Sequence, residues 1–190
     1  MKNLLTPFLI FSLLISCKPE IKQKETAVKE ETVELSSNNE INENIYSNEL
    51  LNLSFSYPKN WEVQSDTINK VVYIMSNSSS DDGFKEMINI MVGDSKGLSL
   101  DDFFSLNMTV IDETFDELSI SDGPGETEIN GREFKKVKYN YIVQGYPLTN
   151  HIFVTNRDSS VYIVSCSALQ NTFDQYQDQF MSIVNSIEIR

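Results

Sequence analysis

The sequence predicts an α+β domain in which a mostly antiparallel β-sheet is flanked by helices. Segments that alternate apolar and polar residues outnumber helical segments, and several of them follow one another through tight turns. Two amphipathic helices interrupt the strands at separate places in the chain. Antiparallel strands with helices packed on the sheet are typical of this fold class.

The first half of the folded region contains four predicted strands followed by a helix. The strands are Asn52–Pro58, a segment through Trp61 and Val63, Val71–Met75 and Met87–Val92. Ser99 and Asp102 have the spacing of a helix-capping pair, and apolar residues then recur at helical spacing as far as Phe115. Because Asp112 and Asp116 would form a like-charge pair on a longer helix, we expect this helix to end near Thr114.

The second half is predicted to form a strand meander and a C-terminal helix. Asn130-Gly131 is the dipeptide favoured in a two-residue hairpin turn, because both positions need positive φ. The last helix has capping-box spacing at Thr172 and Gln175, and its apolar stripe runs to Ile187. The strands are Leu118–Ser121 and Glu126–Ile129 on either side of a turn at Asp122–Gly125, then Phe134–Gln144, Leu148–Thr155 and Ser160–Ala168.

The N-terminal segment has the layout of a bacterial lipoprotein signal. Lys2 precedes an apolar run that ends in Leu14-Ile15-Ser16-Cys17, and cleavage before Cys17 would make this cysteine the lipidated first residue. As a helix, residues 4–15 would span only about 18 Å, whereas the bilayer core is roughly 30 Å thick. We therefore expect no retained transmembrane helix.

Composition divides the chain into three parts. We predict a signal peptide (1–16), a lipidated cysteine with a flexible polar tether (17–48), and one folded domain (49–190) in which order begins near Leu50. The formal net charge of −13 disfavours binding to nucleic acid and to anionic lipid head groups. Membrane association should therefore come from the lipid on Cys17.

The segment Asn52–Trp61 (NLSFSYPKNW) resembles the opening of PsbP-like domains, in which a short strand ends in a Tyr-Pro turn and a Trp. Four later features also resemble PsbP-like domains: the strand ending at 89–92, the helix opening at Ser99–Phe103, the long meander and the aromatic-rich C-terminal helix. This group includes PsbP of photosystem II, the Ran-binding Mog proteins and the bacterial lipoprotein DcrB. The resemblance implies an α/β/α sandwich used for binding or assembly rather than catalysis, and no functional residue of the family is carried over.

The residues that could support chemistry have simpler structural explanations. His151 is the single histidine and lies in a predicted strand on the face of Phe153. A zinc site needs three or four ligands, and no other histidine or cysteine lies near His151 in the sequence. Because Cys17 would carry the lipid, Cys166 has no cysteine partner within the chain for a disulfide. Strand alternation places Cys166 on the face of Tyr162, Val164 and Ala168, and we expect it to be a buried small hydrophobe.

The acidic clusters of the sequence are Asp81-Asp82, Asp101-Asp102, and Asp112-Glu113 with Asp116-Glu117. None has the residue spacing of a calcium-binding EF-hand loop. A weak site for a hard cation at the third cluster remains an open alternative.

No nucleophile elbow, zinc-helix motif or phosphate-binding glycine loop occurs in the sequence. We therefore expect no catalytic, metal-binding or cofactor-binding residues, and Cys17 is the one predicted functional residue. The expected function is a lipid-anchored envelope module that binds an envelope protein. In many Gram-negative species, an Asp directly after the lipidated cysteine retains a lipoprotein in the inner membrane. This chain has Lys18 at that position, so its resemblance to such lipoproteins favours the outer membrane.

Two alternatives remain open from the sequence alone. The protein could carry or sense a small apolar ligand held between sheet and helix, which requires an apolar cavity of roughly several hundred Å³. An envelope hydrolase would instead require titratable side chains that converge in a cleft.

Overall fold

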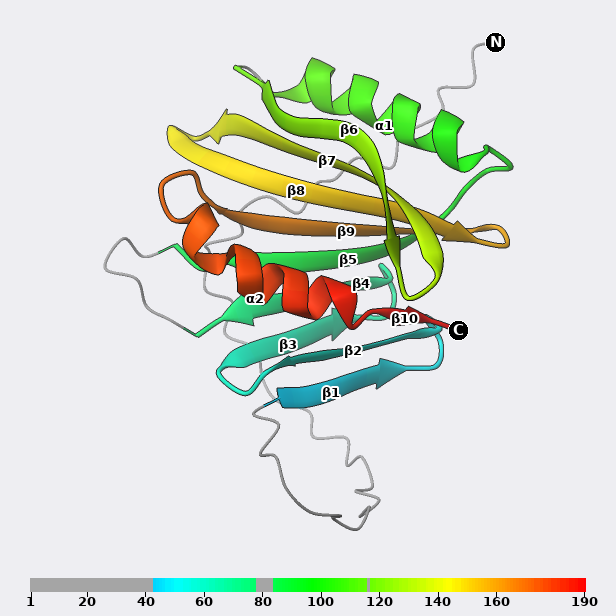
Figure 1. The fold of residues 1–190 in the computed structure, drawn as a ribbon. Coiled ribbons are helices and arrows are strands. Elements are labelled where there is room, and N and C mark those ends of the chain that lie inside the picture. Colours follow the sequence, from blue (N-terminus) through cyan, green and yellow to red (C-terminus); the bar gives the residue numbers. More distant parts are fainter. Residues whose placement is uncertain (1–42, 78–83, 116) are drawn as a thin grey trace.

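The computed structural model describes residues 43–77, 84–115 and 117–190, which form an α+β domain of two sheets and two helices (Figure 1). The helices are α1 (Leu100–Thr114) and α2 (Phe173–Asn185). The strands are β1 (Glu43–Asn48), β2 (Leu53–Pro58), β3 (Trp61–Asp66), β4 (Val71–Ser76), β5 (Met87–Asp94), β6 (Ser119–Ile129), β7 (Arg132–Val143), β8 (Tyr146–Arg157), β9 (Ser160–Leu169) and β10 (Glu188–Ile189).

The larger sheet has seven strands in the order β3-β4-β5-β9-β8-β7-β6, and every neighbouring pair is antiparallel. The smaller sheet has the order β1-β2-β10 and is also antiparallel. The predicted fold class is therefore confirmed, with the addition of a second sheet.

The two helices cover opposite faces of the seven-stranded sheet. Helix α2 packs against β9 and β2, and α1 packs against β8 and β7. Alternation along β9 separates the two cores: Val164 and Cys166 belong to the cluster under α2, and Ile163 belongs to the cluster under α1. Strand β9 is buried along almost its whole length, as expected for a strand covered on both faces.

The structure begins earlier than predicted. Strand β1 occupies residues 43–48, inside the predicted tether, and pairs with β2. Its sequence is too polar to indicate a strand by itself, and tertiary contacts stabilise it, including a stack of Tyr46 on Phe55 with ring centroids 4.9 Å apart. The predicted signal peptide, Cys17 and the tether up to residue 42 lie outside the described residues.

Strand β6 also differs from its prediction. The two predicted segments and the turn between them form one strand, which pairs with β7 through register shifts between Ile120 and Asp122 and between Asp122 and Gly125. Such bulges absorb extra residues without ending the pairing. Gly123 has φ +81°, and a Cβ there would lie 3.1 Å from the carbonyl oxygen of Lys136, so only glycine fits this close approach.

The helix ends agree with the sequence in part. Ser99 caps α1 by accepting a hydrogen bond from the amide of Asp102, and the helix ends at Thr114 as predicted. Thr172 makes no side-chain cap at α2, and its hydroxyl donates to the carbonyl of Leu169. Helix α2 ends at Asn185, earlier than predicted, and the chain then forms β10, which the sequence did not indicate.

Neither helix within the described ranges has the length and apolar character needed to cross a lipid bilayer.

Candidate functional site

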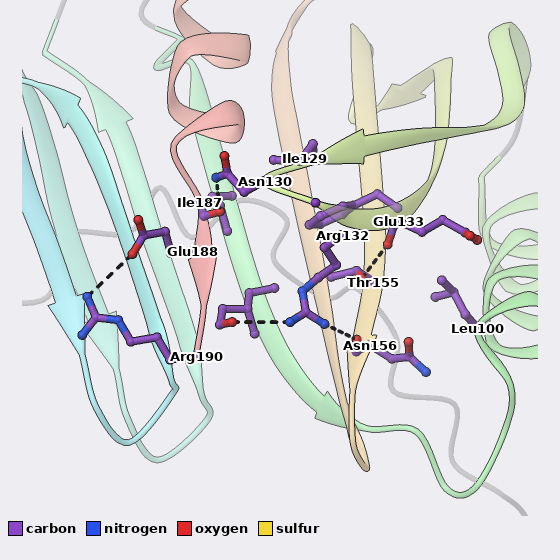
Figure 2. Close-up of a pocket in the computed structure, with 13 residues that line it drawn as sticks. Leu100, Ile129, Asn130, Arg132, Glu133, Thr155, Asn156, Ile187, Glu188 and Arg190 are labelled. Carbon is purple, nitrogen blue, oxygen red and sulfur yellow. Dashed lines mark hydrogen bonds and ion pairs between the residues drawn. The ribbon is translucent and has the colours of Figure 1, made fainter.

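A groove of about 820 Å³ lies between β10 and the ends of β7 and β8 (Figure 2). Its lining comes from the β6–β7 hairpin (residues 129–134), from Thr155 and Asn156 of β8, from Leu100 at the start of α1, and from residues 187–190. The groove thus separates an edge of the small sheet from one end of the large sheet.

The β6–β7 turn positions the first polar side chain of the groove. Asn130 and Gly131 have φ values of +51° and +73°, as the predicted hairpin turn requires. The side-chain Nδ2 of Asn130 donates to the carbonyl oxygen of Ile187 at 2.8 Å and to that of Asn185 at 3.0 Å. The turn therefore fixes the segment that leads from α2 into β10.

Arg132 spans the groove. Its Nη1 donates to the carbonyl oxygen of Asn156 at 3.0 Å, and its Nη2 lies 3.5 Å from the carbonyl oxygen of Ile189 (Figure 2). The guanidinium is therefore held from both walls, by β8 and by β10.

Strand β10 has a partner strand on one side only. Glu188 and Ile189 pair with Ser54 and Leu53 of β2, and the opposite edge of β10 faces the groove. An open strand edge exposes backbone hydrogen-bonding groups. Here the side chains of Asn130 and Arg132 donate to carbonyls on that edge, so they take the place of a neighbouring strand.

The charges at the groove are unevenly paired. The carboxylate of Glu133 lies 3.5 Å from Lys135 Nζ, and that of Glu188 lies 3.7 Å from Arg190 Nη2. Arg132 forms no ion pair with any carboxylate of the described residues and bonds only to backbone carbonyls. Its positive charge therefore has no carboxylate counterion among the described residues.

The pKa of Tyr162 shows that the charge of Arg157, like that of Arg132, acts on this buried phenol. Burial raises the pKa of its phenol, and the positive charges of Arg157 and then Arg132 oppose that rise. Its hydroxyl donates to the carbonyl of Leu51 at 3.0 Å. The fields of Arg132 and Arg157 thus overlap at this phenol.

The groove can bind hydrogen-bonding ligands, but its lining contains no histidine or cysteine. The hydroxyl of Thr155 is occupied in a hydrogen bond to the carbonyl of Glu133 at 2.7 Å. In the described ranges, no three metal-ligating side chains gather at one place.

His151 lies on β8 against Phe153, as predicted, with ring centroids 4.2 Å apart. Burial, followed by the charges of Lys136 and Lys138, lowers the pKa of its imidazole to about 4, and Asp122 opposes the shift. Its Nε2 atom has no hydrogen-bond partner among the described residues. The side chain is neutral at pH 7 and structural in character.

Cys166 is buried in the cluster under α2 with Tyr162, Val164 and Ala168, which confirms the predicted face. Burial raises the pKa of its thiol. The thiol is therefore protonated at neutral pH and is a poor nucleophile.

The acidic pairs that can be located are explained by the fold. Asp102 accepts a hydrogen bond from the hydroxyl of Ser99 at 2.7 Å, and Asp101 lies 2.6 Å from Lys135 Nζ. Asp112 and Glu113 lie in the last turn of α1, which ends before Glu117. Asp81, Asp82 and Asp116 lie outside the described residues.

The space between α1 and the sheet does not form the cavity that an apolar carrier requires. The cavity there measures about 10 Å³ and is lined mainly by Phe104, Met108, Ile111, Val137 and Ile152. This volume is close to that of a single water molecule. This cavity is too small for an apolar ligand of ordinary size.

Sequence reasoning did not identify the groove. It predicted the Asn130-Gly131 turn, but not the contacts of Asn130 and Arg132 with residues more than fifty positions away along the chain. One signal was available: the chain has three arginines, of which Arg132 begins β7, Arg157 ends β8 and Arg190 follows β10, and two of them, Arg132 and Arg190, line the groove.

No protein-family model and no curated protein sequence matches this chain. Solved structures do. CyanoP, the PsbP of the cyanobacterium Synechocystis sp. PCC 6803, is 15% identical with a TM-score of 0.55 over 82% of this chain and 99% of its own. LpqN of Mycobacterium tuberculosis, described as involved in cell envelope biogenesis, is 12% identical with a TM-score of 0.56 over 71% of this chain and 81% of its own.

The Ran-binding protein Mog1p of Saccharomyces cerevisiae is 7% identical, with a TM-score of 0.53 over 78% of this chain and 95% of its own. Proteins this different in sequence share architecture without sharing a task. The comparison therefore shows the fold alone, and this fold is the PsbP- and Mog-like one.

Proposed function

We propose that this protein is a lipid-anchored, non-catalytic module of the cell envelope that binds a partner or ligand in the groove between β10 and β8. The groove is the observation that carries the proposal. Its volume of about 820 Å³ lies within the usual range of ligand sites, and backbone groups and polar side chains line it. The groove offers hydrogen bonds and one unpaired cation, which suit recognition.

The anchor rests on the N-terminal sequence. An acylated Cys17 would hold the protein to a membrane, because each buried methylene contributes about 0.8 kcal/mol and several acyl chains bind stably. Lys18 supports the outer membrane as its place. The fold shared with LpqN, which is described as involved in cell envelope biogenesis, supports an envelope role without identifying the task.

Fractionation tests the anchor. We expect Cys17→Ser to move the protein from membranes to the soluble fraction of the cell. Cys166→Ala, which changes the other cysteine of the chain, should leave it in membranes. Membrane association that survives Cys17→Ser would contradict the proposal.

Crosslinking in cells, followed by affinity capture and mass spectrometry, tests binding in the groove. Asn156→Trp places a large side chain in the groove and should abolish capture of the specific partner. Asn60→Trp, in the exposed β2–β3 turn outside the groove lining, is the matched control and should leave capture unchanged. Equal capture by both variants would show that the groove is not the binding site.

A further inference from the structure

We propose that the groove binds an oxyanion, a phosphate or carboxylate group of its ligand, through the guanidinium of Arg132. This inference rests on the proposed function, because it names the chemistry recognised by the same groove. Arginine is suited to the task, since its planar fork of donors matches both oxyanions.

The guanidinium of Arg132 is preorganised for this role. It carries five N–H donors, and two of them bond to the carbonyls of Asn156 and Ile189, so three have no partner among the described residues. The two carbonyls come from opposite walls and hold the group between them (Figure 2). A fixed donor group loses little conformational entropy when a ligand binds.

A second positive charge, that of Arg157, acts near Arg132. Arg132 is the first residue of β7 and Arg157 is the last residue of the neighbouring strand β8, both beyond Lys135 and Val154, the last residues that pair between these two strands. Both charges act at the phenol of Tyr162. Two positive charges near one phenol repel each other, and an oxyanion bound beside them would relieve the repulsion.

The carboxylates nearby leave this charge available. Glu133 faces Lys135, and Glu188 faces Arg190, which also donates to the hydroxyl of Ser54. Asp158 contacts Arg157 only at 3.9 Å and is 91% exposed, so that pair is weak. The described part of this acidic chain thus places an arginine without an ion-pair partner in a groove large enough for a ligand.

The test is an NMR titration of the mature chain, residues 17–190 with Cys17→Ser, at constant ionic strength. Three arginines give three side-chain Nε signals, so Arg132 can be followed directly. Inorganic phosphate and citrate are the two probes, each added to about 20 mM, which suits millimolar affinity. We expect saturable movement of the Arg132 signal, and the probe that binds more tightly assigns phosphate or carboxylate chemistry.

Three variants control the result. Arg132→Gln should weaken binding roughly tenfold, as expected for loss of a charged hydrogen bond. Because Arg132 also holds β10, Arg157→Gln provides a second test that leaves those bonds in place, and it should weaken binding about threefold. Lys59→Gln is the matched control, since this exposed lysine lies in the β2–β3 turn outside the groove lining, and it should change binding less than about twofold.

The inference is overturned if neither probe saturates, or if Arg132→Gln and Lys59→Gln bind equally well. These failures differ from failure of the proposed function. Capture that depends on the groove, without binding of either probe, would retain the function and reject the oxyanion. Probe binding without any captured partner would retain the oxyanion site and reject the proposed function.

Discussion

His151 is the residue whose protonation should most clearly affect the folded state. Burial lowers the pKa of its imidazole to about 4, below the ordinary value of 6.5, so the folded protein favours the neutral form. The stability from this group is complete above pH 6.5 and is lost as the pH falls from 6.5 through about 4. We expect a loss of about 1–2 kcal/mol, which is discounted because the ring is partly exposed.

Thermal unfolding at pH 7, 5.5 and 4.5 measures this loss. His151→Leu should flatten the dependence relative to the native chain, because the carboxylates titrate in both proteins and cancel in the comparison. The single histidine also gives an unambiguous NMR titration. An imidazole that titrates near 6.5 in the folded protein would contradict the prediction.

Cys166 provides a second prediction for a single residue. Its thiol is buried and its pKa is raised, so a thiol reagent should reach it only when the domain opens. In a Cys17→Ser chain, Cys166 is the sole thiol. We expect no labelling in buffer over an hour or so and one label per chain in denaturant; rapid labelling of the folded protein would contradict the buried placement.

The helices differ in how their first turns are stabilised. Ser99 both caps α1 and donates to Asp102, whereas Thr172 makes no cap bond at α2. Ser99→Ala should therefore reduce the free energy of unfolding by about 1 kcal/mol. Thr172→Ala should cost roughly half as much or less. Denaturant unfolding of the two variants measures the difference, and equal losses would contradict the assigned caps.

At the scale of whole strands, length and pairing decided what could be predicted. The central strands β4, β5, β8 and β9 are long or strongly apolar, so their periodicity indicated them. Strand β1 is polar and β10 has two residues, so neither has a pattern of its own. Both exist because β2 pairs with them.

For the molecule as a whole, the sequence predicted the layers but not the groove. The apolar stripes of α1 and α2 and the two apolar faces of β9 require helices on both sides of the sheet. The groove depends instead on bonds from Asn130 and Arg132 to the backbone of residues 185–189. Such contacts carry no local periodicity, because any side chain within reach can bond to a carbonyl.

The central claim is that this fold works by binding at the β10–β8 groove while anchored to a membrane. Its most direct measurement is photo-crosslinking in cells, with a photoreactive residue at position 156 in the groove or at position 64 on β3, the opposite edge of the large sheet. We predict one discrete crosslinked product from position 156, lost when Arg132→Gln is added, and none from position 64. Identical products from both positions, or no product from position 156, would contradict the account.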